Sequence, residues 1–111
     1  MRVILDECLP RKLGAEIVGH DVTTVPKAGF ASIVNGTLLQ QLDGKFDAFV
    51  TVDKSIPSQQ KTRELSFGIL ILRARSNRLA DLKPLVPQIL SSLHSVGPGQ
   101  VVVIAPPAAR S

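Results

Sequence analysis

Two acidic positions stand directly after apolar runs that are typical of buried strands. Asp6 and Glu7 follow Arg2–Leu5, and Asp53 follows Ala48–Val52. If these runs are neighbouring parallel strands, their carboxyl ends meet at one edge of a sheet and the carboxylates emerge together. Two carboxylates about 4 Å apart repel by roughly 4 kcal/mol at an effective dielectric constant of 20, which favours a divalent cation, a shared proton or a nearby arginine. Magnesium suits such a pair because it takes oxygen ligands and keeps several waters.

A structural role is the alternative for the same side chains. Aspartate is among the commonest N-cap residues, because its carboxylate accepts hydrogen bonds from the free amides of a first helical turn. In that case Asp6 caps the helix that follows it, Asp53 caps the segment after it, and Glu7 faces solvent. Replacing either aspartate by alanine then costs about 1 kcal/mol of stability and changes nothing else.

A basic segment follows a further strand-like run, 68–72. It contains Arg73, Arg75 and Asn77 and leads into the start of a helix. Arginine side chains and helix-end amides suit a phosphate group, through bidentate bonds and N–H donors. Lys54, beside the second acidic position, is another candidate phosphate contact. The alternative is a solvated basic loop in which Asn77 caps the helix.

The remaining reactive side chains are less informative. The single cysteine, Cys8, excludes an internal disulfide and a cysteine-built zinc site, and we interpret it as a small buried hydrophobe. His20 and His94 lack a partner at ligand spacing. The sequence contains neither a glycine-rich phosphate loop nor a G-x-S-x-G elbow.

Strand-like and helix-like runs alternate along the chain. The expected strands are Arg2–Leu5, His20–Val25, Ala48–Val52, Gly68–Leu72 and Val101–Ala105. The expected helices lie after Pro10, from Val34 to Leu42, near 58–65 as a short polar helix, and over 79–93 with a division at Pro84. This alternation predicts an α/β fold, a three-layer α/β/α sandwich with a mostly parallel central sheet of about five strands.

Length and composition set the remaining bounds. The 111 residues fit one domain, 1–111, in which 105–111 form a frayed tail. Four Phe with no Trp or Tyr argue against an aromatic platform for stacking bases. The longest apolar runs fall far short of the roughly 20 residues that span a membrane, and the first residues do not have the pattern of a signal peptide. We therefore expect a cytoplasmic protein with no membrane partner.

Two segments resemble the bacterial PIN-like domains: Leu5-Asp6-Glu7-Cys8-Leu9-Pro10 and Phe46-Asp47-Ala48-Phe49-Val50-Thr51-Val52-Asp53-Lys54. Shorter matches are Gly19-His20-Asp21-Val22 and Leu72-Arg73-Ala74-Arg75-Ser76-Asn77. The resemblance runs from residue 1 to about 104. It is closest to the short branch long catalogued as a domain of unknown function and grouped with VapC-type toxins.

This resemblance implies an α/β/α sandwich and, in active relatives, a Mg²⁺- or Mn²⁺-dependent ribonuclease. Asp6 matches the first metal-binding acid, and Asp53 matches the later acid at a strand end. PIN-like domains usually carry another acid on the helix that begins here near Asn35. Relatives often have Asn-Gly-Glu at that point, whereas this chain has Thr37, which supplies no charge.

Three hypotheses follow for function. The first is a PIN-like, metal-dependent endoribonuclease, with the toxin of a toxin–antitoxin pair as its specific form and an antitoxin protein as partner. Asp6, Asp53 and Glu7 are its catalytic candidates, and the two aspartates are its Mg²⁺ or Mn²⁺ ligands. Its candidate RNA contacts are Arg73, Arg75, Lys54 and Asn77.

The second hypothesis is a catalytically degenerate PIN-like module that binds RNA or a partner protein. It rests on Thr37 and on the small number of acids at the site. The third is a small α/β protein that forms a homodimer and uses its aspartates as caps. A nuclease needs metal at the acidic site, whereas a binding module needs only the basic surface at 73–78.

Overall fold

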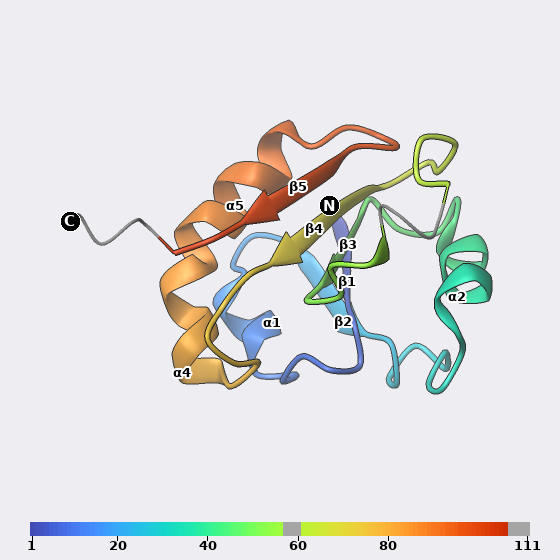
Figure 1. The fold of residues 1–111 in the computed structure, drawn as a ribbon. Coiled ribbons are helices and arrows are strands. Elements are labelled where there is room, and N and C mark those ends of the chain that lie inside the picture. The colour runs from blue at the N-terminus through green and yellow to red at the C-terminus, as the bar shows by residue number, and fades with distance from the viewer. Residues whose placement is uncertain (57–60, 107–111) are drawn as a thin grey trace.

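Five short strands form one sheet. In the computed structural model, which describes residues 1–56 and 61–106, the strands are β1 (Arg2–Leu5), β2 (Asp21–Thr24), β3 (Ala48–Thr51), β4 (Gly68–Leu72) and β5 (Val101–Ile104). They lie in the order β2-β1-β3-β4-β5, and each neighbouring pair is parallel (Figure 1). The predicted α/β class and parallel sheet are confirmed. Every residue of the central strands β3 and β4 is buried, as expected where both faces of a sheet are covered.

The helices are short. They are α1 (Leu13–Glu16), α2 (Asn35–Leu42), α4 (Leu79–Leu82), the 3-10 helix η1 (Lys83–Leu85) and α5 (Val86–Ser95). The predicted division at Pro84 is confirmed, because η1 separates α4 from α5. Residues 61–65 are not helical, so that part of the expected helix at 58–65 is wrong; 58–60 lie outside the described residues, as does 107–111 of the expected tail. None of the helices described here has the length and apolar composition needed to cross a membrane.

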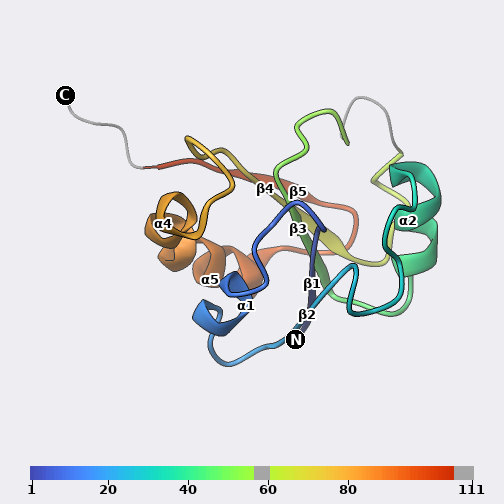
Figure 2. The ribbon, with the colours of Figure 1, turned by 90° about the horizontal axis from the view of Figure 1, so that it is seen from below.

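Alternate strand residues pack into two separate apolar layers. Val3, Leu5 and Val50 pack against α1, α4 and α5 on one face of the sheet. Ile4 and Phe49 pack against α2 on the other face. Figure 2 shows α1, α4 and α5 together on one side of the strands and α2 on the opposite side. This two-sided packing follows from the alternation of side chains along each strand, and it agrees with the predicted three layers.

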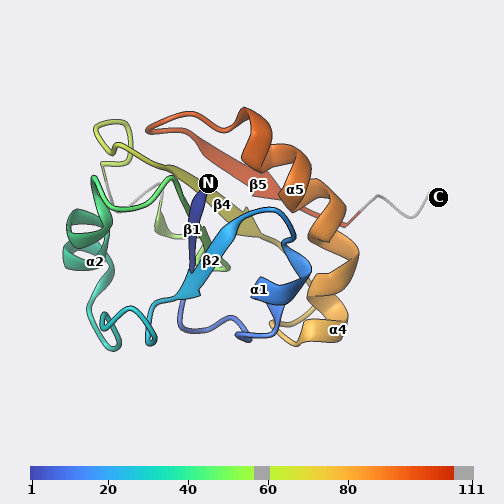
Figure 3. The ribbon, with the colours of Figure 1, turned by 180° about the vertical axis from the view of Figure 1, so that it is seen from behind.

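One of the connections between parallel strands has an unusual handedness. The connections from β1 to β2 and from β4 to β5 run in opposite directions along the sheet, yet both pass over the α1 face (Figure 3). Because they run in opposite directions across the same face of the sheet, one of these connections is right-handed and the other is left-handed. The crossovers through α1 and α2 have the right hand found in about 98% of cases, so the crossover through α4 and α5 is left-handed. On the α2 face of β5, Val103 consequently remains 53% exposed.

Two histidines meet at the amino edge of the sheet. His20 lies just before β2, and its ring centroid is 6.0 Å from that of His94 in the last turn of α5. The Nδ1 atom of His20 is buried without a hydrogen-bond partner among the described residues. Burial, then the N-terminal ammonium group and His94, lower the pKa of His20. The folded state therefore favours its neutral form.

This lowered pKa predicts the direction of a pH effect on stability. The unfolded state takes up the His20 proton near pH 6.5, whereas the folded state takes it up only at lower pH. The free energy of unfolding should therefore fall as the pH drops below about 6.5. In His20→Gln this loss should be smaller, as measured by urea unfolding between pH 7.5 and 5. His94→Gln removes only the weakest of the three causes that lower the pKa of His20, so its pH dependence should be closer to that of the unmodified protein. If the free energy of unfolding changed equally with pH in the unmodified protein and in His20→Gln, this explanation would be contradicted.

Candidate functional site

The carboxyl ends of β1 and β3 lie side by side at the topological switch point, where the strand order of the sheet reverses. From β1 the chain passes to β2, and from β3 it passes to β4 on the other side. Leu5 pairs with Val50, and the backbone N–H of Asp6 extends this pairing by donating to the Val50 carbonyl at 2.8 Å. Open parallel sheets bind ligands at such a switch point. Asp6 and Asp53 therefore emerge at the same edge, from adjacent strands.

Asp6 is a buried carboxylate, only 8% exposed. Its Oδ1 atom accepts the Glu7 N–H at 2.8 Å, and its Oδ2 atom accepts the Thr51 hydroxyl at 2.6 Å. Both oxygens of this buried group are therefore hydrogen-bonded, as a buried polar group requires. The capping alternative is wrong for Asp6, because α1 begins only at Leu13 and has no side-chain cap.

The carboxylate of Asp53 stabilises the turn that follows it in the chain. Its Oδ1 atom accepts both the N–H of Ser55, at 2.9 Å, and the Ser55 hydroxyl, at 2.5 Å. These bonds match the capping role that is the structural alternative for Asp53. The N–H of Asp53 in turn donates to the Thr51 hydroxyl oxygen at 3.1 Å. One hydroxyl group thus connects the two acidic positions.

Thr51 is a site residue that our sequence reasoning did not select. It is fully buried at the end of β3, where it donates to Asp6 and accepts from Asp53. The available signal was a polar residue inside an apolar strand run. Thr51 and Asp53 are also two positions apart, the spacing that places side chains on the same side of an extended chain.

Glu7 is directed elsewhere. Its Oε1 atom accepts the N–H of Ser32 at 3.0 Å, where the Ser32 backbone has a left-handed φ of 65°. The side chain is exposed, as the solvent-facing alternative predicts. This bond fixes the loop before α2, and it involves neither Asp6 nor Asp53.

The basic segment lies against the acidic edge. A cavity of about 180 Å³ is lined by Val52, Lys54, Leu72, Arg73, Ala74, Ser76 and Asn77. The fold therefore brings Lys54, Arg73 and Asn77 together, whereas Arg75 is exposed and lies outside this lining. Asn77 is not a helix cap, because its Nδ2 atom donates to the Cys8 carbonyl at 2.7 Å and the N-cap of α4 is Arg78. That bond joins the loop after β4 to the loop after β1.

Cys8 is exposed, so its interpretation as a small buried hydrophobe is wrong. Its place in the β1–α1 loop, beside the acidic edge, explains the difference. Partial burial and the neighbouring Asp6 carboxylate raise the pKa of the Cys8 thiol. Because the thiolate is the reactive form, the raised pKa makes Cys8 a poor nucleophile at neutral pH.

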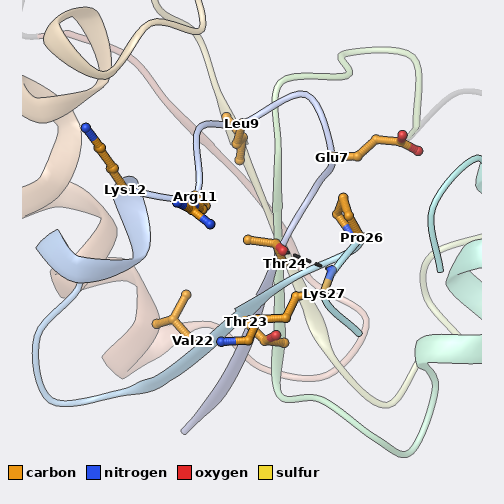
Figure 4. A pocket seen from close by; sticks show the side chains of 9 residues that line it. All are labelled: Glu7, Leu9, Arg11, Lys12, Val22, Thr23, Thr24, Pro26 and Lys27. Atoms are coloured by element: carbon orange, nitrogen blue, oxygen red, sulfur yellow. Dashed lines mark hydrogen bonds between the residues drawn. The ribbon is translucent and has the colours of Figure 1, made fainter. Parts of the chain in front are cut away.

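A larger cavity, of about 770 Å³, lies on the β2 side of the same edge. It is lined by Glu7, Leu9, Arg11, Lys12, Val22, Thr23, Thr24, Pro26 and Lys27 (Figure 4). Our sequence reasoning did not select its three basic residues. They come from two separate loops, and only the pairing of β1 with β2 brings these loops together.

Carboxylate oxygens are the donor atoms that the acidic edge offers to a divalent cation. The Asp6 carboxylate accepts the Glu7 N–H and the Thr51 hydroxyl and is also hydrogen-bonded to the Cys8 side chain, so one of its four lone-pair sites remains for a cation. Carboxylate oxygens are the ligand type that magnesium and manganese prefer, and magnesium needs only one or two carboxylates beside its waters. Over residues 1–56 and 61–106, no group of three or more His, Cys, Asp or Glu side chains could hold a metal. The carboxylates that this edge offers to a cation are therefore those of Asp6 and Asp53.

No protein-family model, curated protein or solved structure was found that matches this chain.

The hydroxyl of Thr51 gives a stability prediction. In Thr51→Val the buried Oδ2 atom of Asp6 loses its donor, and the Asp53 N–H loses its acceptor. Leaving a buried polar group unsatisfied costs about 1–3 kcal/mol, so the free energy of unfolding should fall by roughly that amount in urea denaturation. Thr51→Ser keeps the hydroxyl and serves as the matched control. If the valine variant were as stable as the serine variant, the bond to Asp6 would contribute nothing.

Proposed function

We propose that this chain is a PIN-like domain that cleaves RNA with a divalent cation, Mg²⁺ or Mn²⁺, and that it acts as the toxin of a toxin–antitoxin pair. The observation that carries the proposal is the arrangement around Thr51. Asp6 and Asp53 follow adjacent parallel strands at the switch point of the sheet, and the Thr51 hydroxyl bonds the carboxylate of the first and the backbone N–H of the second. The sequence resemblance to PIN-like domains at the same two aspartates supports the assignment.

Asp6 and Asp53 are the proposed metal ligands. The hydrogen bonds from Thr51 and Glu7 fix the orientation of the Asp6 carboxylate, and those from Ser55 fix that of Asp53. Such supporting partners commonly orient metal ligands. When bound, a divalent cation supplies Lewis-acid polarisation of a phosphoryl oxygen and lowers the pKa of a water molecule.

The basic residues beside the acids are the proposed contacts for the RNA backbone. Lys54 and Arg73 line the small cavity next to Asp53, and Asn77 closes it from the loop after β4. Arginine binds phosphate oxygens in bidentate geometry, and lysine neutralises charge without requiring one orientation. The exposed Arg75 lies further along the same loop and extends the positive surface. Contacts of this kind bind RNA largely without regard to sequence.

A binding module without catalysis is the second candidate, and one observation favours it. Thr37, at the position where relatives carry an acid, is exposed on α2. Glu7 is held by Ser32, so the acidic edge has two carboxylates rather than three or four. The two candidates share the RNA surface and an antitoxin or second copy as protein partner. They differ in whether metal is bound.

RNA cleavage with and without metal tests the proposal. The protein should cleave single-stranded RNA in Mn²⁺ or Mg²⁺ and stop in EDTA. Asp53→Asn should reduce the cleavage rate at least 100-fold and abolish Mn²⁺ binding in calorimetry, because the amide is a much weaker cation ligand. Asparagine keeps an oxygen for Ser55, so the turn is preserved. Lys83→Gln, an exposed change in η1 outside the linings of both cavities, is the matched control.

Each outcome separates the candidates. Cleavage that requires metal and Asp53 supports the nuclease. RNA binding without metal binding or cleavage supports the non-catalytic module. Cleavage that persists in Asp53→Asn would contradict the proposed ligand set, and failure to bind both RNA and metal would exclude the nuclease and an RNA-binding module, leaving only a module that binds a partner protein.

A further inference from the structure

The cavity of about 770 Å³ at the ends of β1 and β2 is not explained by the proposed metal site. Its volume lies in the range of pockets that bind small molecules. Its lining includes Glu7, which follows Asp6 directly in the chain, so the two features are neighbours along one rim of the sheet. A ligand that crosses this rim would contact both.

The lining of the cavity favours an anion. Three of its side chains, Arg11, Lys12 and Lys27, are cationic, and only Glu7 is acidic. Figure 4 shows Arg11 extending toward Thr24 and Lys27 extending toward Val22, whereas Glu7 and Lys12 point away from the other lining side chains. The carboxylate of Glu7 is also bonded to the Ser32 N–H, which lies outside the cavity. The charge that faces the cavity is therefore positive.

The wall formed by β2 adds neutral donors. The N–H of Asp21 donates to the Met1 carbonyl and that of Val25 to the Leu5 carbonyl, so odd-numbered amides on this strand face β1. By the alternation of parallel pairing, the amides of Val22 and Thr24 point to the open edge of the sheet. The Thr24 hydroxyl oxygen accepts the Lys27 N–H at 3.2 Å, which leaves its proton to donate. Backbone amides and a hydroxyl beside cations are typical of phosphate sites.

We propose that this cavity is a phosphate subsite, an inference that rests on the proposed function. It holds the nucleotide of the RNA strand that neighbours the nucleotide bound at Asp6 and Asp53. The phosphate lies between Arg11 and Lys27 and accepts hydrogen bonds from the backbone amides at the open edge of β2. The apolar side chains of Leu9, Val22 and Pro26 contact the sugar or base by van der Waals packing, without an aromatic stacking partner. Selectivity for a particular base is therefore weak.

Binding of short ligands in EDTA tests the subsite without the metal. Adenosine 5′-monophosphate should bind and shift the NMR amide signals of Val22, Thr24 and Lys27, whereas adenosine should not bind. Arg11→Gln/Lys27→Gln should raise the dissociation constant of the nucleotide at least tenfold, and Lys83→Gln should leave it unchanged. A 5′-phosphorylated triadenylate should bind at least tenfold more tightly than the mononucleotide, because it also reaches the Lys54 and Arg73 surface.

Failure of this inference is distinct from failure of the nuclease proposal. The subsite is overturned if adenosine 5′-monophosphate does not bind, or if the double variant binds it as tightly as the unmodified protein. Equal affinities for the mononucleotide and the triadenylate would overturn the assignment to an RNA strand. Asp53→Asn should keep the nucleotide affinity within twofold, so loss of cleavage in that variant with retained nucleotide binding leaves the subsite standing.

Discussion

A buried carboxylate is stable only when its oxygens are hydrogen-bonded, and the end of β1 places Asp6 under that constraint. The constraint is met by parallel pairing with β3, which brings the Thr51 hydroxyl to Asp6 and, through the same oxygen, orders the backbone of Asp53. The central strands are apolar on both faces, so their register is fixed by the two helical layers rather than by the polar edge. The acidic edge is thus built at the ends of two strands from the interior of the sheet.

Charge is distributed around this edge in a way that suits a polyanion. On one side the loops after β1 and β2 supply Arg11 and Lys27, and on the other the loops after β3 and β4 supply Lys54 and Arg73. The two acids lie at the switch point between these loops. Carboxylates alone would repel a phosphodiester, so an RNA strand at this edge requires either a cation between Asp6 and Asp53 or contact limited to the flanking basic residues. A nuclease therefore requires the cation, whereas a binding module requires only the flanking basic residues.

Much of the fold was predictable because its signals are local. Strands buried on both faces are continuous apolar runs, and their alternation with helix-like runs predicts a parallel sheet. The meeting of Asp6 and Asp53 at one edge follows from the same argument, since parallel strands end together. The left-handed crossover through α4 and α5 was not predictable, because right-handed connections are the rule and nothing in the run 73–100 specifies a face of the sheet.

The unpredicted parts of the site depend on contacts between distant segments. Thr51 gains its role only from pairing with β1, 45 positions away in the sequence. Asn77 has the sequence context of a helix cap, yet it bonds to Cys8 because the loop after β4 crosses that after β1. Glu7 follows Asp6 directly in the chain but turns to Ser32 instead. In each case a side chain with a plausible local role is used for a long-range contact.

The location of a bound cation is the central claim, and paramagnetic Mn²⁺ tests it most directly. Substoichiometric Mn²⁺ broadens the NMR amide signals of residues near the ion. The account predicts that Glu7, Val52 and Lys54 broaden first, that His20 and His94 at the opposite edge do not, and that Asp6→Asn removes the effect while retaining an oxygen for Thr51. Broadening that is uniform, or that is unchanged in Asp6→Asn, would contradict a cation site at the ends of β1 and β3.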